Sequence, residues 1–331
     1  MAGSRLLKMV LVYMIVVVIA TIFFLPNSTD RAYRAFKVDK GHAYCLAFTS
    51  DGRRVAVGSG YTKNGTGGVI GSRGTITVWD IESGEKELRF SLEEKLGYVQ
   101  VIEYHPDGTA IAVVDGEEIT LWDAKAGKFT RSLGYGTQVV FAPDGKKVIA
   151  STNRGVRSWD LATGIEQSSR DRHKESIVGM AVALDRQRCA TASQDGTVLI
   201  WDTRTLQVEE ELHASGQGTR CIAFSTDGRF VACGGDDRTV LMWDLKEPKL
   251  VKTFKNHSHV VWSLAFSPKH NMLAAGCHDG TIALWDVNQK KVIRTISAHT
   301  DIITAVKFSP SGSMLGSACH DGTVKLWFLS E

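Results

Sequence analysis

Short runs of hydrophobic positions, separated by turn-forming residues, recur along the chain as one repeating unit. In one copy, apolar runs at 221–224 and 230–233 flank the turn residues 226–228 (Thr-Asp-Gly). A third run ends in a tryptophan, as at 198–201, and a more polar fourth run follows, as at 291–296. Short apolar runs bounded by Asp, Gly and Pro turns predict β-strands. Each unit is therefore expected to be a small antiparallel sheet of four strands.

The spacing of tryptophan gives the period of this unit. Seven tryptophans follow one another at intervals of 43, 37, 42, 42, 42 and 42 residues, and six of them precede Asp. Self-similarity at a fixed period of this length is typical of repeat proteins. A sheet that is apolar on both faces cannot bury them alone, so units must stack, and closing the stack into a ring leaves only short edges. The seven are Trp79, Trp122, Trp159, Trp201, Trp243, Trp285 and Trp327, and the one remaining tryptophan is Trp262.

At this spacing the Trp-Asp pairs resemble the WD-repeat (WD40) family of β-propellers, over about 300 of the 331 residues. The resemblance implies an all-β fold, a seven-bladed β-propeller of four-stranded antiparallel blades. After Trp327 the last unit lacks a fourth strand. Residues 31–39 (RAYRAFKVD) look like that strand and precede a Gly-His pair, as 291–297 precede Ala298-His299. We therefore expect this N-terminal segment to complete blade seven and close the ring.

An uncharged apolar segment stands outside the repeats. Residues 9–25 are 17 consecutive residues without a charge, and the apolar run can be extended to begin at residue 6. About 20 residues cross a hydrocarbon core of about 30 Å, so a transmembrane α-helix is predicted. A cleaved signal peptide is the alternative, but the run is longer than the usual signal-peptide core and no A-x-A-like site follows it. The predicted order is a flank (1–8), a membrane helix (9–25), a linker (26–30) and the propeller (31–331).

The orientation of this single-pass membrane protein stays open. Arg5 and Lys8 precede the segment, and four basic residues follow it at 31, 34, 37 and 40. The positive-inside rule therefore favours a cytoplasmic propeller only weakly, while upstream basic residues usually send the C-terminal domain outward. The six cysteines lie in predicted strands without CxxC spacing, which is typical of core residues in a reducing compartment.

Composition narrows the class of partner. Apolar residues make up 43% of the chain and charged residues 23%, close to the average for folded soluble domains. The net charge of +3 is too small to indicate the clustered basic face of a nucleic-acid-binding protein. No nucleic-acid partner is expected.

Three units carry a His, a hydroxyl or small residue, an Asp and a Trp in the same order. A His, a Ser and an Asp could form a nucleophilic triad. In WD-repeat proteins, however, this set is a buried hydrogen-bond network, and its recurrence favours that role because a catalytic site needs one copy. No catalytic residue is therefore predicted. The set is His173, Thr191, Asp195 and Trp201 in blade four; His257, Asp279 and Trp285 in blade six, with Ala275 at the hydroxyl position; and His299, Ser317, Asp321 and Trp327 in blade seven.

Two Cys-His pairs, Cys277-His278 and Cys319-His320, raise the question of zinc binding, because sulfur and imidazole nitrogen suit that metal. Adjacent residues of a strand point to opposite sides, so at most the two imidazoles could converge. A core cysteine beside a surface histidine is the favoured interpretation. No metal and no cofactor is predicted.

A glycine-rich stretch at 58–74 interrupts blade one. It lacks the G-x-x-x-x-G-K-[ST] pattern of a phosphate-binding loop, so we interpret it as an insertion of roughly ten residues between the second and third strands. Insertions on a repeat scaffold tend to lie on the binding face. Trp262 is the strongest candidate anchor on that face, with a locally packed aromatic residue as the alternative. The partner-binding candidates are Trp262, Ile302, His278, His320, Asp236 and Gln194.

These features predict a membrane-tethered scaffold or adaptor, not an enzyme, that binds protein or peptide partners through the face of the second-to-third-strand turns. Because fold does not fix function, this rests largely on the family resemblance. The alternative is an enzyme, or a propeller that binds a cofactor or metal, acting at the central channel. It would need convergent titratable groups, and blades one to three show none in their sequence.

Overall fold

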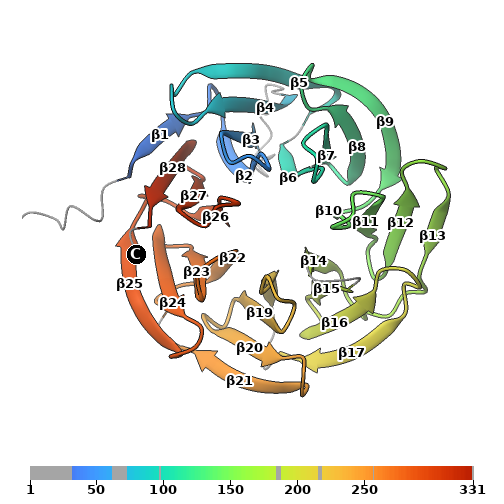
Figure 1. Cartoon of the computed structure of the whole chain (residues 1–331), viewed down its shortest axis with the longest axis vertical. Coiled ribbons are helices and arrows are strands. Elements are labelled where there is room, and N and C mark those ends of the chain that lie inside the picture. Colours follow the sequence, from blue (N-terminus) through green and yellow to red (C-terminus); the bar gives the residue numbers. More distant parts are fainter. Residues whose placement is uncertain are drawn as a thin grey trace, which may run out of the picture.

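Seven four-stranded antiparallel sheets form a closed ring around a central channel (Figure 1). The computed structural model describes residues 32–61, 73–96, 98–183, 188–214, 218–255 and 257–329. Within each sheet the strands pair in chain order from the channel outward, except in the last, where the outermost strand is the first of the chain. The predicted seven-bladed propeller is confirmed.

The strands of the first four blades follow one another along the chain. Blade one consists of β2 (His42–Phe48), β3 (Arg54–Gly60), β4 (Arg73–Asp80) and β5 (Lys86–Leu96), and blade two of β6 (Val99–Tyr104), β7 (Ala110–Asp115), β8 (Glu118–Asp123) and β9 (Lys128–Tyr135). Blade three consists of β10 (Gln138–Phe141), β11 (Lys147–Ser151), β12 (Val156–Asp160) and β13 (Glu166–Ser168), and blade four of β14 (Ile177–Val182), β15 (Arg188–Ser193), β16 (Thr197–Asp202) and β17 (Val208–His213).

The last three blades repeat the pattern and close the ring. Blade five consists of β18 (Thr219–Phe224), β19 (Phe230–Gly235), β20 (Val240–Asp244) and β21 (Lys249–Phe254), and blade six of β22 (Val261–Phe266), β23 (Met272–Cys277), β24 (Thr281–Asp286) and β25 (Lys291–Ser297). Blade seven consists of β26 (Ile303–Phe308), β27 (Met314–Cys319), β28 (Thr323–Phe328) and β1 (Arg34–Lys37).

The hydrophobic core lies between neighbouring blades. Each of the seven regularly spaced tryptophans is the next-to-last residue of the third strand of its blade and is at most 6% exposed. Between blades five and six, for example, Met242 packs with Leu273 and Trp285 in one cluster. Both faces of a blade are therefore buried against other blades, which explains why its inner strands are apolar on both sides.

The chain closes the ring by pairing its first strand with its last. β1 runs antiparallel to β28, with Phe36 opposite Val324, and Tyr33 N–H donates to the Leu326 carbonyl at 2.7 Å. Phe36 is buried and stacks on Trp79 of blade one, with ring centroids 5.4 Å apart. The predicted closure by residues 31–39 is confirmed for the strand itself, which spans four of those residues.

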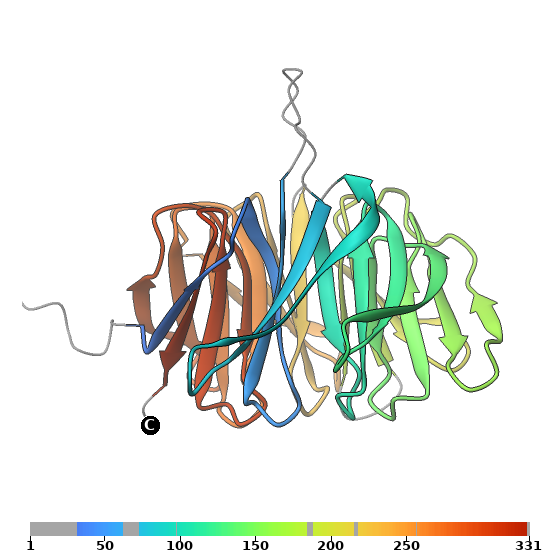
Figure 2. The same cartoon turned by 90° about the horizontal axis from the view of Figure 1, so that it is seen from above.

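The two faces of the propeller carry different turns between strands. We call the face that bears the turns between the second and third strands the upper face, and the opposite one the lower face (Figure 2). Near the upper end of the innermost strand, six blades contain a β-bulge, which re-aims one side chain. The bulged residues are Tyr44, Gln100, Val178, Arg220, Trp262 and Thr304.

The predicted membrane helix at 9–25, its flank at 1–8 and the linker at 26–30 lie outside the described residues. Most of the 58–74 insertion also lies outside them, and its two ends join β3 to β4. Over the part of the chain that is described, no helix is long and apolar enough to span a bilayer.

Candidate protein-binding face

The hydrogen-bond network predicted for blade four is present and buried. His173 Nε2 lies 2.7 Å from Thr191 Oγ1, which also accepts the Trp201 indole N–H at 2.8 Å. At the other nitrogen of the imidazole, His173 Nδ1 lies 2.9 Å from Thr197 Oγ1 and 3.3 Å from Asp195 Oδ2. The Asp195 carboxylate in turn accepts the Lys174 N–H at 2.7 Å. One threonine hydroxyl thus links the loop that enters the blade to the tryptophan of its third strand.

Blade seven repeats this arrangement with a serine. Ser317 Oγ lies 2.7 Å from His299 Nε2 and accepts the Trp327 indole N–H at 3.1 Å. His299 Nδ1 contacts Thr323 Oγ1 at 3.0 Å and lies 3.9 Å from Asp321 Oδ2. Both ring nitrogens of His299 therefore have partners within the blade.

Blade six lacks the hydroxyl, and its network is incomplete. Ala275 stands where blades four and seven have Thr191 and Ser317. As a result His257 Nε2 and Trp285 Nε1 are buried without a hydrogen-bond partner. His257 Nδ1 instead lies 3.3 Å from Cys277 Sγ, and Asp279 bonds Ser258 and Thr281 rather than the imidazole.

Burial sets the protonation of these groups. It lowers the pKa of His299 to about 4, helped by the nearby Lys325, and it raises the thiol pKa of Cys277 and Cys319 to about 12. Burial alone would raise the pKa of Asp195, but hydrogen bonds from Thr197 and Lys174 lower it to about 2. At neutral pH the network holds neutral imidazoles, ionised aspartates and protonated thiols, an arrangement that fixes loops rather than one that supplies an activated nucleophile.

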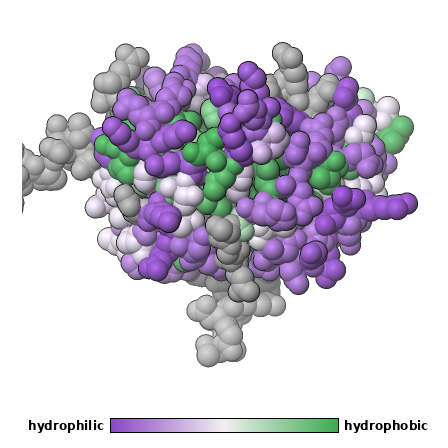
Figure 3. Space-filling view, turned by 90° about the horizontal axis from the view of Figure 1, so that it is seen from below, coloured by the Kyte–Doolittle hydropathy of each residue, from purple (hydrophilic) through white to green (hydrophobic). Residues whose placement is uncertain are grey.

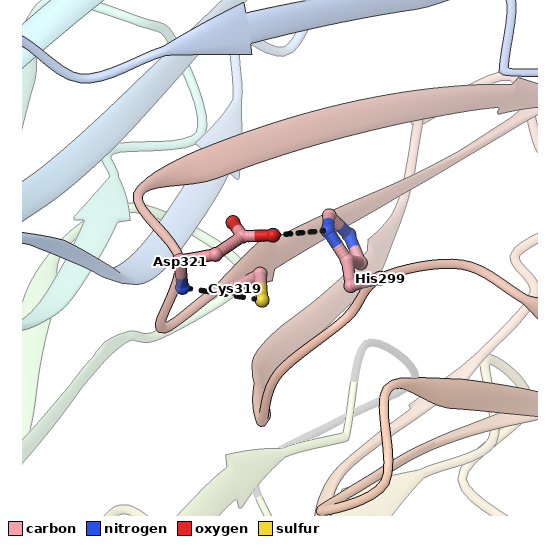
Figure 4. Close-up of side chains that lie close together, drawn as sticks. All are labelled: His299, Cys319 and Asp321. Carbon is pink, nitrogen blue, oxygen red and sulfur yellow. Dashed lines mark hydrogen bonds and ion pairs between the residues drawn. The ribbon is translucent and has the colours of Figure 1, made fainter.

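His299, Cys319 and Asp321 are the one group among the described residues whose potential metal-ligating atoms all lie within 4.8 Å of one another (Figure 4). The donors are already engaged: Cys319 Sγ accepts the Asp321 N–H at 3.4 Å, and His299 bonds Ser317 and Thr323. In the two Cys-His pairs the cysteine and the histidine differ in burial. Cys277 and Cys319 are buried, whereas His278 is exposed and His320 is half-buried.

The central channel is apolar at its lower end. A cavity of about 370 Å³ there is lined mainly by residues from the lower ends of the innermost strands, such as Phe48, Phe224 and Phe308. Among its lining residues the titratable ones are Glu103, Lys307 and Tyr104. Glu103 of blade two and Lys307 of blade seven form an ion pair at 3.7 Å, and burial raises the pKa of Tyr104 to about 12.

The upper face carries a stacked charge pair between blades five and six. Arg220 binds the Asp236 carboxylate through two bonds, Nε to Oδ1 at 2.8 Å and Nη2 to Oδ2 at 3.1 Å. The same guanidinium lies over the Trp262 ring, 4.8 Å from its centroid. Trp262 is half-buried and its indole N–H is covered, so the guanidinium and the outer ring face are what this cluster presents to solvent.

A second cluster on the upper face crosses the seam of the ring. His42 of blade one and His320 of blade seven stack with their ring centroids 3.6 Å apart. Tyr44 stands edge-on to both and lies 4.2 Å from the Tyr98 ring of blade two. Tyr61, at the base of the insertion, is 41% exposed beside His42. Aromatic side chains thus gather where the first, second and last blades meet.

The remaining predicted candidates are spread along the same face. Gln194, Asp236 and His278 are exposed, and Ile302 is half-buried. His278 lies beside His259 with ring centroids 6.3 Å apart. The sequence interpretation missed Arg220, His42, Tyr44, Tyr98 and Tyr61. Arg220 could have been found, because it lies 42 residues before Trp262 and therefore at the same place in the preceding repeat.

The lower face holds a close counterpart of the Arg220 cluster in the same blade. Arg229 contacts Asp244 Oδ2 through Nε at 3.0 Å and Nη2 at 2.7 Å. Its guanidinium lies 4.8 Å from the centroid of the Phe230 ring. Blade five thus carries two arginine–aspartate pairs on aromatic rings, one at each face, which makes each a control for the other.

The closed ring of seven four-stranded blades makes the chain a seven-bladed β-propeller, and in sequence it is similar to other β-propellers. A family model for the second β-propeller of echinoderm microtubule-associated proteins matches residues 177–331.

Curated relatives cover a similar part of the chain. Cell division cycle 20.1, a cofactor of the APC complex from Arabidopsis thaliana, is 25% identical over 135 residues, which are 39% of this chain and 29% of that protein. Autophagy-related protein 16 from the same plant is 25% identical over 152 residues (44% and 29%), and the anaphase-promoting complex subunit cdc20 of Dictyostelium discoideum is 23% identical over 153 (45% and 31%). In each case the matched part is about a third of the relative's length.

Proposed function

We propose that this protein is a membrane-tethered scaffold whose upper face binds a segment of another protein. The observation that carries the proposal is the Arg220–Asp236 pair stacked on Trp262 at the upper end of the channel. Arginine and large aromatic residues dominate the binding energy of protein interfaces. Here both are held in place before any partner arrives, because the carboxylate fixes the guanidinium over the ring, which lowers the entropy lost on binding.

The clusters at the seam and at blade five would bind different parts of one segment. His42, Tyr44 and Tyr61 offer ring faces and edges beside the insertion, whereas the blade-five cluster offers a guanidinium. An extended segment across the channel mouth could reach both. The relatives fit this role, since their names describe a cofactor and a subunit of a protein complex.

The tether is the second part of the proposal, and its support is the uncharged run at 9–25. The proposal places the propeller close to a bilayer and leaves open on which side of the bilayer the propeller lies. Protease protection in sealed vesicles decides the side, because a propeller inside the lumen is cut only after the vesicles are opened.

We propose no catalytic role. The channel cavity brings together one carboxylate, one amine and one phenol among its lining residues, and the carboxylate and amine already pair. A substrate turned over by the purified chain, or a cofactor retained by it, would contradict this part of the proposal.

Affinity capture with matched variants tests the binding face. The tagged full-length chain is extracted in detergent as wild type, as Arg220→Ala and as Arg229→Ala, and the proteins recovered with each are compared. We expect a stoichiometric partner with wild type and Arg229→Ala and a loss of at least tenfold with Arg220→Ala, because the two arginines differ chiefly in the face they occupy. A partner lost equally with both variants, or with Arg229→Ala alone, contradicts the upper-face assignment. Circular dichroism establishes that both variants fold.

A further inference from the structure

Blade seven departs from the other six at the residue after its tryptophan. Six blades have Asp there, and its carboxylate caps the turn to the fourth strand, as Asp160 does for the Ala162 and Thr163 N–H groups. Blade seven needs no such turn, because its fourth strand is β1. In blade seven the residue is Phe328, which is 53% exposed. No turn follows it that would require a particular side chain at this position.

Phe328 forms an exposed aromatic pair with Tyr33, which precedes β1. Their ring centroids lie 4.3 Å apart, and Tyr33 is 44% exposed. The Arg34 guanidinium lies 5.5 Å from the centre of the Tyr33 ring. Because the two rings cover each other only in part, they leave apolar surface exposed that an apolar partner could contact.

The pair lies where the described chain begins and ends, on one side of the ring (Figures 1 and 2). Ala32 and Leu329 pack into the cluster that contains Trp327 and Ile296 of β25. β25 adds Val292 and Ile293, both exposed, to the same side. By contrast, the edge of the ring seen from the side of β21 is mainly hydrophilic, with its hydrophobic residues in small separate patches (Figure 3).

The length of chain before Tyr33 limits how far this side can lie from a membrane. Seven residues, 26–32, separate Leu25, the last of the apolar run, from Tyr33. Fully extended they reach at most about 25 Å. A membrane that holds residues 9–25 therefore lies within that distance of the aromatic pair.

We infer that the edge of blade seven formed by Tyr33 and Phe328, with Val292 and Ile293 of β25 beside it, lies in the headgroup region of the lipid bilayer. This inference rests on the proposed tether. Tyrosine concentrates at that depth in membrane proteins because its apolar ring carries a polar hydroxyl. Phenylalanine is among the apolar side chains that interfacial segments bury there. The Arg34 side chain, which also donates to the Glu82 carbonyl, adds a cation that anionic headgroups attract. The ring then stands on its edge, and its upper face points along the membrane and stays open to a partner.

A single fluorophore in two matched positions tests this placement. Phe328→Cys and Phe129→Cys are labelled with NBD in the full-length chain and reconstituted in vesicles of phosphatidylcholine and phosphatidylserine. Phe129 lies on β9, the outermost strand of blade two, which blade one separates from blade seven. It is 55% exposed and also contacts a neighbouring aromatic ring. The six native cysteines are buried, so the introduced thiol takes the label. We expect headgroup-proximal doxyl lipids to quench NBD at position 328 at least threefold more than at position 129.

Equal quenching at the two positions overturns the inference while leaving the tether intact, since it would mean that the ring turns freely at the end of its linker. A blue-shifted emission at position 328 that grows with protein concentration but is not quenched by doxyl lipid overturns it in favour of contact between two copies of the chain. Release of the protein from the vesicles by alkaline carbonate refutes the tether, and the inference with it. Tyr33→Cys repeats the test if the change at 328 prevents folding.

Discussion

Blades six and seven are adjacent, pair their first two strands in the same register, and differ at the residue that supplies the hydroxyl of the hydrogen-bond network. In blade seven the Ser317 hydroxyl satisfies both the His299 imidazole and the Trp327 indole. In blade six Ala275 provides no hydroxyl, and the corresponding two nitrogens are buried without partners. The sheets have the same four strands and the same bulge in the innermost strand. We call this shared hydroxyl the hub of the network. The fold tolerates its loss in one blade, provided that the neighbouring blades pack against both faces of that blade.

This difference shows what the recurring residues do. They are not needed to form a blade, because hydrophobic packing between blades does that. They satisfy the polar groups that the packing buries, and each group left unsatisfied costs free energy. The blades with complete networks should therefore tolerate the loss of the hub least.

Removal of the hydroxyl in blade seven should have the largest effect on stability. Ser317→Ala leaves His299 Nε2 and Trp327 Nε1 buried without partners. Each orphaned group costs about 1–3 kcal/mol, so the free energy of unfolding should fall by about 2–6 kcal/mol. Urea denaturation followed by tryptophan fluorescence measures it. Ser313→Ala, an exposed serine of the same blade, is the control. A cost for Ser317→Ala no larger than that of the control contradicts the role of the hub.

Acidification should destabilise the ring through the buried histidines. Burial lowers the pKa of His299 in the folded state to about 4, below the value of about 6.5 expected in the unfolded chain. Its contribution is therefore complete above pH 6.5 and is lost as the pH falls toward 4, which amounts to about 2 kcal/mol by pH 5. His299→Gln should flatten the decline in stability between pH 7 and pH 5 by about that amount. A variant with the same pH dependence as wild type would assign the decline to other groups.

Restoration of the hydroxyl in blade six should stabilise the protein modestly. Ala275→Ser places an oxygen near His257 Nε2 and Trp285 Nε1, and a new buried hydrogen bond contributes about 1 kcal/mol. The same denaturation experiment measures the gain. A loss of stability instead would show that blade six has closed around the alanine, so that the oxygen has no room.

The smallest effect is expected for chemical modification of the Cys277 thiol in blade six. The Cys277 thiol, whose pKa burial raises to about 12, should not react with a thiol reagent at pH 8 while the protein is folded, despite its contact with His257. The other five cysteines are buried as well. Counting modified thiols before and after denaturation checks this. Fast modification of one thiol in the native protein would mean that its imidazole neighbour activates it.

Much of the fold could be read from the sequence, because tryptophan spacing, turn residues and hub residues all recur with one period. Closure by the N-terminal strand could be predicted for the same reason. The side-chain contacts within the clusters on the upper face could not, although the repeat does place Arg220 at the position of Trp262. His42 and His320 stack although they lie 278 positions apart in the sequence, and their contact depends on the closure of the propeller. The partial burial of Trp262 under Arg220 arises from bulges at equal positions in two blades, and a bulge leaves no clear pattern of hydrophobic positions.

Site-specific cross-linking tests most directly whether the upper face is where a partner binds. p-Benzoylphenylalanine is placed in the full-length chain at Tyr61, on the upper face, or at Phe129, on the outer edge of blade two; both are exposed aromatic residues. After irradiation in cells, our account predicts one discrete cross-linked protein from position 61 and none from position 129. A discrete cross-link from position 129 with none from position 61 would contradict it.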